Sequence, residues 1–179
     1  MEETNKQYYT ISVYTENNVG LVNRISTIFL KRHVNLLSMT ASESEIEDVY
    51  RFTILVKMTE EKVKKIVGQI EKQIEVIKAF YHTDDETISQ ETALFKVASD
   101  LLFDEPQIQN IIKRSGANIV TVNKKFFVIQ KTGRRIETEA LYSALKPYGL
   151  LQFTRSGRIS VSKEAMNISE VLKDFKEDF

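Results

Sequence analysis

The chain has 179 residues, of which 42% are hydrophobic, so it can bury one large core or two small ones, and we favour two compact domains. Lys and Arg together number 25, as do Asp and Glu, and this balance argues against binding to nucleic acid or to an anionic membrane surface. The absence of cysteine excludes disulfides, thiolate metal sites and a cysteine nucleophile.

The sequence contains neither a membrane-spanning pattern nor a secretion signal. No apolar run approaches the roughly 20 residues that cross a bilayer. The start, Met-Glu-Glu-Thr-Asn-Lys, is acidic and lacks the apolar core of a signal peptide. We therefore expect a cytoplasmic protein.

The first half of the chain predicts a βαββαβ order. Residues 8–13 are β-branched and aromatic, which is typical of a strand. Apolar residues then recur at spacings of three and four over residues 21–32, and again over residues 60–72 after Thr59, which predicts two amphipathic helices. Further strands are predicted at residues 35–42, 49–58 and 76–81. This order is typical of the α+β ferredoxin-like fold, in which two helices cover one face of a four-stranded antiparallel sheet.

The same order is predicted a second time after a polar, acidic stretch. Strands are expected at residues 92–98, 118–122, 126–130 and 150–154, and helices at residues 106–114 and 136–145. We find no residue-level similarity between the halves, so the repeat is architectural. The predicted division is a first domain over residues 8–83, a linker over residues 84–90, a second ferredoxin-like domain over residues 91–165 and a tail helix over residues 166–179.

Side chains suited to catalysis or metal binding are few and scattered. His33 and His82 are the only histidines, and neither has a partner at metal-ligand spacing. The nearest approach is His82-Thr83-Asp84-Asp85, which a polar strand end explains better. No nucleophile elbow, P-loop or dinucleotide-binding glycine motif occurs. This pattern favours a sensor over an enzyme.

The junction between the first strand and the first helix predicts a small-ligand site. Free backbone N–H groups and the positive end of the helix dipole lie at a helix N-terminus, which suits an anion such as an amino-acid carboxylate. Gly20 lets the backbone approach such a ligand closely. The alternative is an ordinary helix start with Asn17 or Asn18 as the N-cap, and spacing alone favours that alternative.

Four segments resemble the regulatory (small) subunit of acetohydroxyacid synthase, also called acetolactate synthase, a family that begins with an ACT domain. The first is Glu16-Asn17-x-x-Gly20 followed by Arg24, and the second is Lys31-Arg32-His33-Val34-Asn35-Leu36. The third is Gln90-Glu91-Thr92-Ala93-Leu94-Phe95-Lys96-Val97, similar to the family's opening of its second domain. The fourth is Thr154-Arg155-Ser156-Gly157, similar to a late Arg-Ser-Gly signature. Their order and spacing over residues 8–163 are far more specific than any one segment.

This resemblance implies a non-catalytic regulatory subunit. In that family the large subunit carries the thiamine diphosphate chemistry that condenses pyruvate with pyruvate or 2-ketobutyrate. The small subunit raises this activity and imposes feedback inhibition by valine, leucine or isoleucine. The chain would then need no cofactor of its own, would bind the large subunit, and would form a homodimer through its first domain.

The resemblance also implies a ligand site shared by two copies, between the strand-to-helix loop of one and the second strand of the other. The ligand contacts would fall on Asn17, Gly20, Leu21, Val22, Asn35 and Leu36. The backbone N–H groups of Gly20, Leu21 and Val22 would bind the effector's carboxylate. The amides of Asn17 and Asn35 would hold its ammonium or carboxylate group, and Leu36 would form part of an apolar wall. The alternatives are a backbone-bonding Asn35 and ordinary core positions for both leucines.

Two positions depart from the pattern of the family it resembles. His33 stands where the family often has a left-handed Gly just past the helix, which costs a non-Gly residue about 1–2 kcal/mol and could shift Asn35. Leu21-Val22 reverses the usual order of bulk after the glycine, so the choice among the three amino acids stays open. A free-standing amino-acid sensor is the alternative function, and an unrecognised enzyme of this fold is the least favoured.

Overall fold

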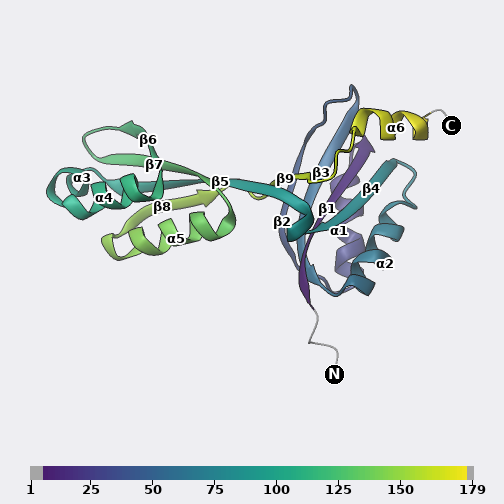
Figure 1. Ribbon diagram of the computed structural model, residues 1–179, viewed down its shortest axis with the longest axis horizontal. Coiled ribbons are helices and arrows are strands. Elements are labelled where there is room, and N and C mark those ends of the chain that lie inside the picture. Colours follow the sequence, from purple (N-terminus) through teal and green to yellow (C-terminus); the bar gives the residue numbers. More distant parts are fainter. Residues whose placement is uncertain (1–5, 177–179) are drawn as a thin grey trace. The chain divides into compact units, whose positions relative to one another are not determined.

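The computed structural model describes residues 6–176, with side chains described up to residue 173. The chain divides into two compact units. The first contains the chain up to Ile88 together with the part from Arg158 onward, and the second runs from Ser89 to Gly157. Each unit is built on an antiparallel sheet (Figure 1).

The first unit has the predicted βαββαβ order, and each predicted element is present with ends that differ from the prediction by at most three residues. The elements are β1 (Gln7–Glu16), α1 (Leu21–Lys31), β2 (Leu36–Glu43), β3 (Val49–Met58), α2 (Glu60–Ile70) and β4 (Val76–Thr83). The sheet order is β2-β3-β1-β4, and each neighbouring pair is antiparallel. This is the ferredoxin-like arrangement that the hydrophobic pattern predicts.

Helices α1 and α2 cover one face of this sheet (Figure 1). Side chains alternate across a strand, so Ile11 and Val13 of β1 share one face. There they pack with Ile25 of α1 and Ile66 of α2, and all four side chains are fully buried. The apolar stripes recognised in the sequence are therefore the core of the first unit.

The last part of the chain covers the opposite face of the same sheet. It forms β9 (Ile159–Ser162) and α6 (Ile168–Lys176), and Leu172 of α6 packs with Tyr14 of β1. Arg158 donates a hydrogen bond to the Thr10 hydroxyl at 3.0 Å, and the Lys163 N–H donates to the Glu86 carbonyl at 2.9 Å. These contacts place residues 158–165 in the first unit, and not in the second domain as predicted from the sequence. The tail helix expected over residues 166–179 is α6, and residues 177–179 lie outside the described part.

The second unit repeats the architecture with two additions. Its elements are β5 (Thr87–Ala98), α3 (Asp100–Asp104), α4 (Pro106–Ser115), β6 (Asn118–Val122), β7 (Phe126–Gly133), α5 (Arg135–Leu145), the 3-10 turn η2 (Lys146–Tyr148) and β8 (Leu150–Arg155). The strand order is β6-β7-β5-β8, and Phe95 and Phe127 are fully buried at its core. The short helices α3 and η2 were not predicted, because a segment of three to five residues shows no helical period.

The polar stretch over residues 84–90 is not an irregular linker. The 3-10 turn η1 (Asp84–Glu86) leads directly into β5 at Thr87. The Glu86 carboxylate accepts hydrogen bonds from the Thr83 N–H at 2.7 Å and from the Thr83 hydroxyl at 2.9 Å, which closes a capping box. Acidic composition indicated a solvated linker, but an acid three residues after Thr83 also serves as a cap.

The two units share local irregularities as well as element order. The pairing of β2 with β3 shifts register after Leu36, and the pairing of β6 with β7 shifts after Ile119. Asn35 directly precedes the first of these residues, and Asn118 directly precedes the second. The repeat therefore reaches single residues, which comparison of the two sequence halves missed.

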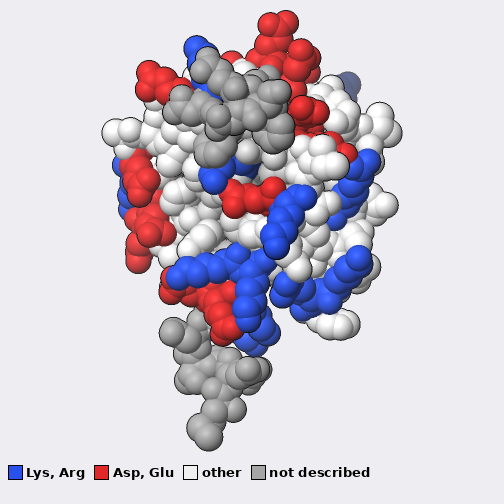
Figure 2. All heavy atoms as spheres, turned by 90° about the vertical axis from the view of Figure 1, so that its right-hand side faces the viewer, with Lys and Arg blue, Asp and Glu red and all other residues white. Residues whose placement is uncertain are grey.

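The surface carries both signs of charge. Figure 2 shows Lys and Arg side chains interspersed with Asp and Glu on the face that it displays. Some of these charges form helical i,i+4 pairs, such as Lys64 with Glu60 at 2.6 Å and Lys65 with Glu61. None of the helices in residues 6–176 has the length and apolar character needed to cross a bilayer.

Candidate functional site

The loop between β1 and α1 begins the helix without a side-chain cap. The N-cap residue is Gly20, at φ 85° and ψ −1°, in the left-handed region. Neither predicted asparagine caps the helix, and Asn18 donates instead to the Glu16 carboxylate at 3.3 Å. A Cβ at position 20 would meet open space, so backbone conformation and not packing selects glycine. The N-cap role considered for Asn17 or Asn18 is therefore wrong.

Backbone N–H groups are available at this helix start. The N–H groups of Gly20 and Val22 have no partner among the described residues. The Leu21 N–H reaches the Asn18 carbonyl at 3.4 Å, and its side chain is buried in the core at 3% exposure. Arg24, in the first turn, pairs with the Glu75 carboxylate, so its charge is already engaged. The positive helix end thus offers two free donors to an anion.

His33 takes up the left-handed conformation at the other end of α1, with φ 52°. The Val34 N–H donates to the Phe29 carbonyl at 3.0 Å, and the His33 N–H donates to the Leu30 carbonyl at 3.0 Å. This pair of bonds is the Schellman motif, which normally has glycine at this position. The helix therefore ends as it would with glycine, and the expected shift of Asn35 has no structural basis.

Asn35 and Leu36 lie at the opposite end of the sheet from the loop. Strands β1 and β2 run in the same direction, since both are antiparallel to β3. Leu36 pairs with Val56, and Val56 pairs with Tyr9, which precedes Glu16 by seven residues. At about 3.3 Å per residue, the two groups of predicted site residues lie roughly 23 Å apart along the sheet. A single chain therefore does not bring the six residues together.

The two asparagine side chains are exposed and unengaged. Neither Asn17 nor Asn35 makes a side-chain hydrogen bond to any described residue, so the backbone-bonding alternative for Asn35 is not observed. Leu36 is half-buried and packs against the core of the first unit, and Val22 is 54% exposed. Asn17, Asn35 and the loop N–H groups are thus free to bind a ligand, whereas Leu21 belongs to the core.

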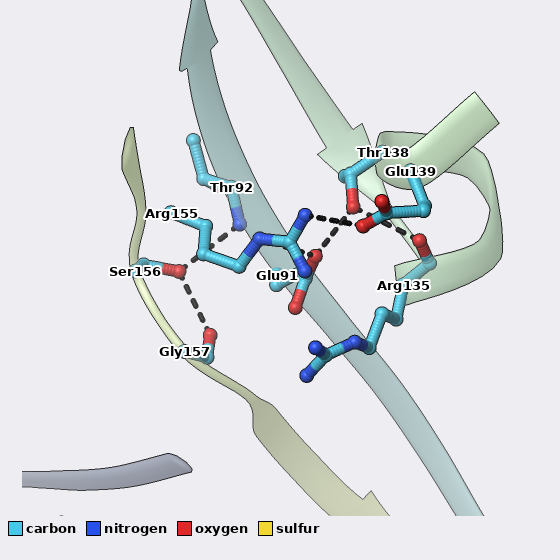
Figure 3. Close-up of polar contacts among 8 residues, drawn as sticks. All are labelled: Glu91, Thr92, Arg135, Thr138, Glu139, Arg155, Ser156 and Gly157. Carbon is cyan, nitrogen blue, oxygen red and sulfur yellow. Dashed lines mark hydrogen bonds and ion pairs between the residues drawn. The ribbon is translucent and has the colours of Figure 1, made fainter. Parts of the chain in front are cut away.

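The late Arg-Ser-Gly segment has a structural role in the second unit (Figure 3). Arg155 of β8 donates to the Glu139 carboxylate at 2.8 Å and lies 3.6 Å from the Glu91 carboxylate, which is 6% exposed. The Thr138 hydroxyl donates to the same Glu91 carboxylate. Arg155 also stacks over the Phe153 ring at 4.9 Å. The cluster joins β5, β8 and α5, and no local sequence pattern indicates it, because Glu91 and Arg155 lie far apart in the chain.

Ser156 and Gly157 turn the chain out of the second sheet. Ser156 donates its N–H to the Thr92 carbonyl at 2.8 Å, and its hydroxyl accepts from the Thr92 N–H at 3.0 Å (Figure 3). Gly157 follows at φ 81°, a conformation that favours glycine. This segment therefore marks the exit from the second unit.

The two histidines do not form a metal site. No group of three or more His, Asp or Glu side chains suited to a metal ion occurs among the described residues. Asp84, the closest acid considered with His82, pairs with Arg158. His82 and Thr83 are the last two residues of β4 (Val76–Thr83), and the 3-10 turn η1 follows from Asp84.

Comparison with known proteins gives consistent similarities over both units. The family described as "AHAS small subunit-like ACT domain" matches residues 11–78, and the family described as "Small subunit of acetolactate synthase" matches residues 90–164. The chain is 34% identical over 155 residues to the acetolactate synthase small subunit of Mycolicibacterium smegmatis, covering 87% of this chain and 91% of the relative. It is 35% identical over 159 residues to the one of Bacillus subtilis, covering 88% and 91%. The crystal structure of the acetolactate synthase small subunit of Thermotoga maritima superposes with a TM-score of 0.80 at 25% identity, covering 89% of this chain and 99% of that one.

Proposed function

Since the chain belongs to the family of acetolactate synthase small subunits, we propose that it activates a thiamine diphosphate-dependent large subunit and imposes feedback inhibition by valine, leucine or isoleucine. It is a regulatory subunit, and its partner is the catalytic large subunit. In this proposal the large subunit supplies the cofactor and the catalytic groups. The present chain supplies an amino-acid sensor.

One observation carries the sensor proposal: the unpaired N–H groups of Gly20 and Val22 at the start of α1. A carboxylate placed there gains two hydrogen bonds and the favourable helix dipole. The exposed amide of Asn35, without a partner among residues 6–173, is the complementary polar group. Together they suit a free amino acid, which presents a carboxylate and an ammonium group on one carbon.

A second copy of the chain would unite the two halves of the site. Within the described residues, β2 is bonded on one side only, to β3. Two copies that pair antiparallel through β2 place the start of one β2 at the end of the other. Asn35 of one copy then lies at the end of the sheet where Gly20 of the other copy stands. The expected solution species is a homodimer, and light scattering should give twice the chain mass of 20.7 kDa. A strictly monomeric species at high micromolar concentration would contradict the shared site.

The sensor proposal is tested by the variant Asn35→Ala in the complex with the large subunit. We expect weaker binding of the effector by about 1–3 kcal/mol, because a charged ligand group loses its partner. This corresponds to a roughly fivefold to hundredfold higher inhibitory concentration. Activation of the large subunit should persist, since the site need not form part of that contact.

The matched control is Asn118→Ala, which removes the asparagine at the equivalent position of the second unit. It should leave the inhibition curve unchanged while producing a similar local effect on stability. Melting temperature and inhibition are measured on both variants. If Asn35→Ala lowers the melting temperature but leaves inhibition by every effective amino acid unaltered, Asn35 does not bind the effector.

A further inference from the structure

The face of the first sheet that α1 and α2 do not cover is largely buried and carries hydroxyl groups beside an apolar cluster. Thr10 and Ser12 of β1 and Thr53 of β3 point to this face, and their exposures are 1%, 7% and 5%. Thr10 and Ser12 are two residues apart on β1, and Ser12 pairs with Thr53 of β3, so all three lie on the face opposite to Ile11 and Val13. Two of these hydroxyls accept hydrogen bonds from arginines, Ser12 from Arg51 and Thr10 from Arg158.

Arg51 of β3 lies on this face and has no acidic partner among the described residues. Its Nη2 donates to the Ser12 hydroxyl at 3.2 Å and to the Ser160 carbonyl of β9. Its Nε is buried without a hydrogen-bond partner, and no carboxylate among the described residues forms an ion pair with it. Arg158, on the same face, does pair with an acid, Asp84. Arg51 is half-buried, and a partly desolvated guanidinium without a counterion is unfavourable, so an anion at this position would be stabilising.

A cavity of about 570 Å³ lies beside Arg51, lined by residues of the first unit alone. Its volume falls within the usual range for small-ligand sites. The floor comes from β1, β3 and β4, and the cover comes from β9 and the segment that leads into α6. Phe80, Met166 and Ile168 give it an apolar wall.

Tyr14 provides a second donor in the cavity. It lies directly across from Arg51 in the sheet, and the Arg51 guanidinium is 5.6 Å from the centre of its ring. Only 2% of its surface is exposed, and burial raises the pKa of its hydroxyl, so the group stays protonated at neutral pH. The hydroxyl makes no hydrogen bond to any residue that the structure describes, so its proton is free to be donated.

The other charges on the cavity restrict the ligand. Glu45, Glu164 and His82 also line it. Glu45 and Glu164 are exposed, so solvent screens their charges, whereas Arg51 is half-buried and its charge is screened less. The two acids nevertheless disfavour a dianion. From the cavity, the unpaired guanidinium and the apolar wall, we propose that this site binds a small organic monocarboxylate with an apolar body, its carboxylate on the Arg51 guanidinium and the Tyr14 hydroxyl and its body against Phe80 and Met166.

The direct test follows the Arg51 side chain by NMR during titration with isovalerate. The Nε–H of Arg51 is the unpartnered donor, so its ¹H–¹⁵N resonance should shift with saturation, and the resonance is assigned by its loss in Arg51→Lys. The neutral isostere 3-methyl-1-butanol has the same body without the charge and should cause no shift. A resonance that does not move with isovalerate, or that moves equally with the alcohol, overturns the proposal.

Variants separate recognition from folding. Arg51→Lys keeps the charge but removes the planar guanidinium donors, and it should weaken isovalerate binding about 10- to 100-fold. Tyr14→Phe removes only the hydroxyl and should weaken binding about 3- to 10-fold. Lys65→Gln, which removes an exposed charge paired with Glu61, should leave binding unchanged. If Tyr14→Phe and Arg51→Lys are both folded and each binds isovalerate as tightly as the parent chain, the proposal is overturned.

This site is separate from the effector site, so loss of isovalerate binding and loss of feedback inhibition can be distinguished. Arg51→Lys should leave feedback inhibition of the complex intact, whereas Asn35→Ala should leave isovalerate binding intact. Loss of both properties in both variants would mean that the two sites are one, which contradicts the inference.

Discussion

Replacing His33 with glycine should stabilise the first unit. His33 holds φ 52° at the end of α1, where its exposed side chain makes no hydrogen bond or ion pair with the described residues. A left-handed conformation costs an L-residue about 1–2 kcal/mol, and histidine lies toward the lower value. Glycine removes that cost but adds about 0.5–1 kcal/mol of unfolded-state entropy. The net gain expected for His33→Gly is up to about 1 kcal/mol, or a melting temperature higher by up to about 4 °C.

Gly116→His is the mirror variant and serves as the control. Gly116 ends α4 at φ 63°, with the Ala117 N–H donating to the Ile112 carbonyl at 3.2 Å, as Val34 donates to Phe29. A Cβ at position 116 would first meet the Lys131 Nζ at 3.8 Å, an ordinary contact. The histidine should therefore lower stability by up to about 1 kcal/mol, because the cost of the left-handed conformation exceeds the unfolded-state entropy that replacing glycine removes.

Both variants are measured by urea unfolding followed by far-UV circular dichroism, with amide exchange at Val34 as the local probe. In His33→Gly the Val34 amide should exchange more slowly, because its bond to the Phe29 carbonyl is held in a relaxed turn. A His33→Gly chain that is less stable than the parent would refute the account of this helix end. An unaffected Gly116→His chain would do the same.

Two further changes test the cap of η1 and the cluster of the second unit. Hydrogen bonds from Thr83 lower the pKa of Glu86. The carboxylate therefore contributes to folding stability above the unfolded-state pKa, and this contribution is lost as pH falls through the folded-state pKa. Glu86→Gln should cost up to about 1 kcal/mol at pH 7, and the difference in urea stability between variant and parent should vanish in strong acid. A pH-independent difference would contradict this. Arg155→Gln should destabilise the second unit by about 2–3 kcal/mol, because it leaves the buried Glu91 carboxylate without its cation. The control is Arg135→Gln, at an exposed position whose side chain pairs with no described acid, and it should change stability by less than about 0.5 kcal/mol. Equal effects of the two variants in thermal unfolding would show that the cluster contributes nothing to stability.

Hydrophobic periodicity predicted the framework of both units, because the apolar face of each main element is long enough to show its period. Helix α1 and strand β3 were placed to within a residue at either end. The return of the chain after Gly157 to the first unit was missed. It depends on contacts between distant residues, such as Arg158 with Asp84 and Arg51 with Ser160, which leave no local pattern.

The candidate site was only partly predictable for the same reason. Local chemistry identified Gly20 and the free donors that follow it, since a glycine before a helix is a local signal. The sequence could not give the separation between this loop and Asn35, which follows from strand direction and register. Arg51 was not predicted as a site residue, because a single charged residue in an apolar strand indicates a solvent-facing position. Its surroundings depend on β9 and α6, which cover that face of the sheet.

The central claim is tested most directly by reconstitution. The purified chain is mixed with the acetolactate synthase large subunit, and acetolactate formation from pyruvate is measured with and without each branched-chain amino acid. The account predicts no product from the chain alone, a higher rate from the mixture than from the large subunit alone, and inhibition of the mixture by at least one of valine, leucine and isoleucine. Acetolactate formed by the chain unaided, or a mixture that is neither activated nor inhibited, would contradict it.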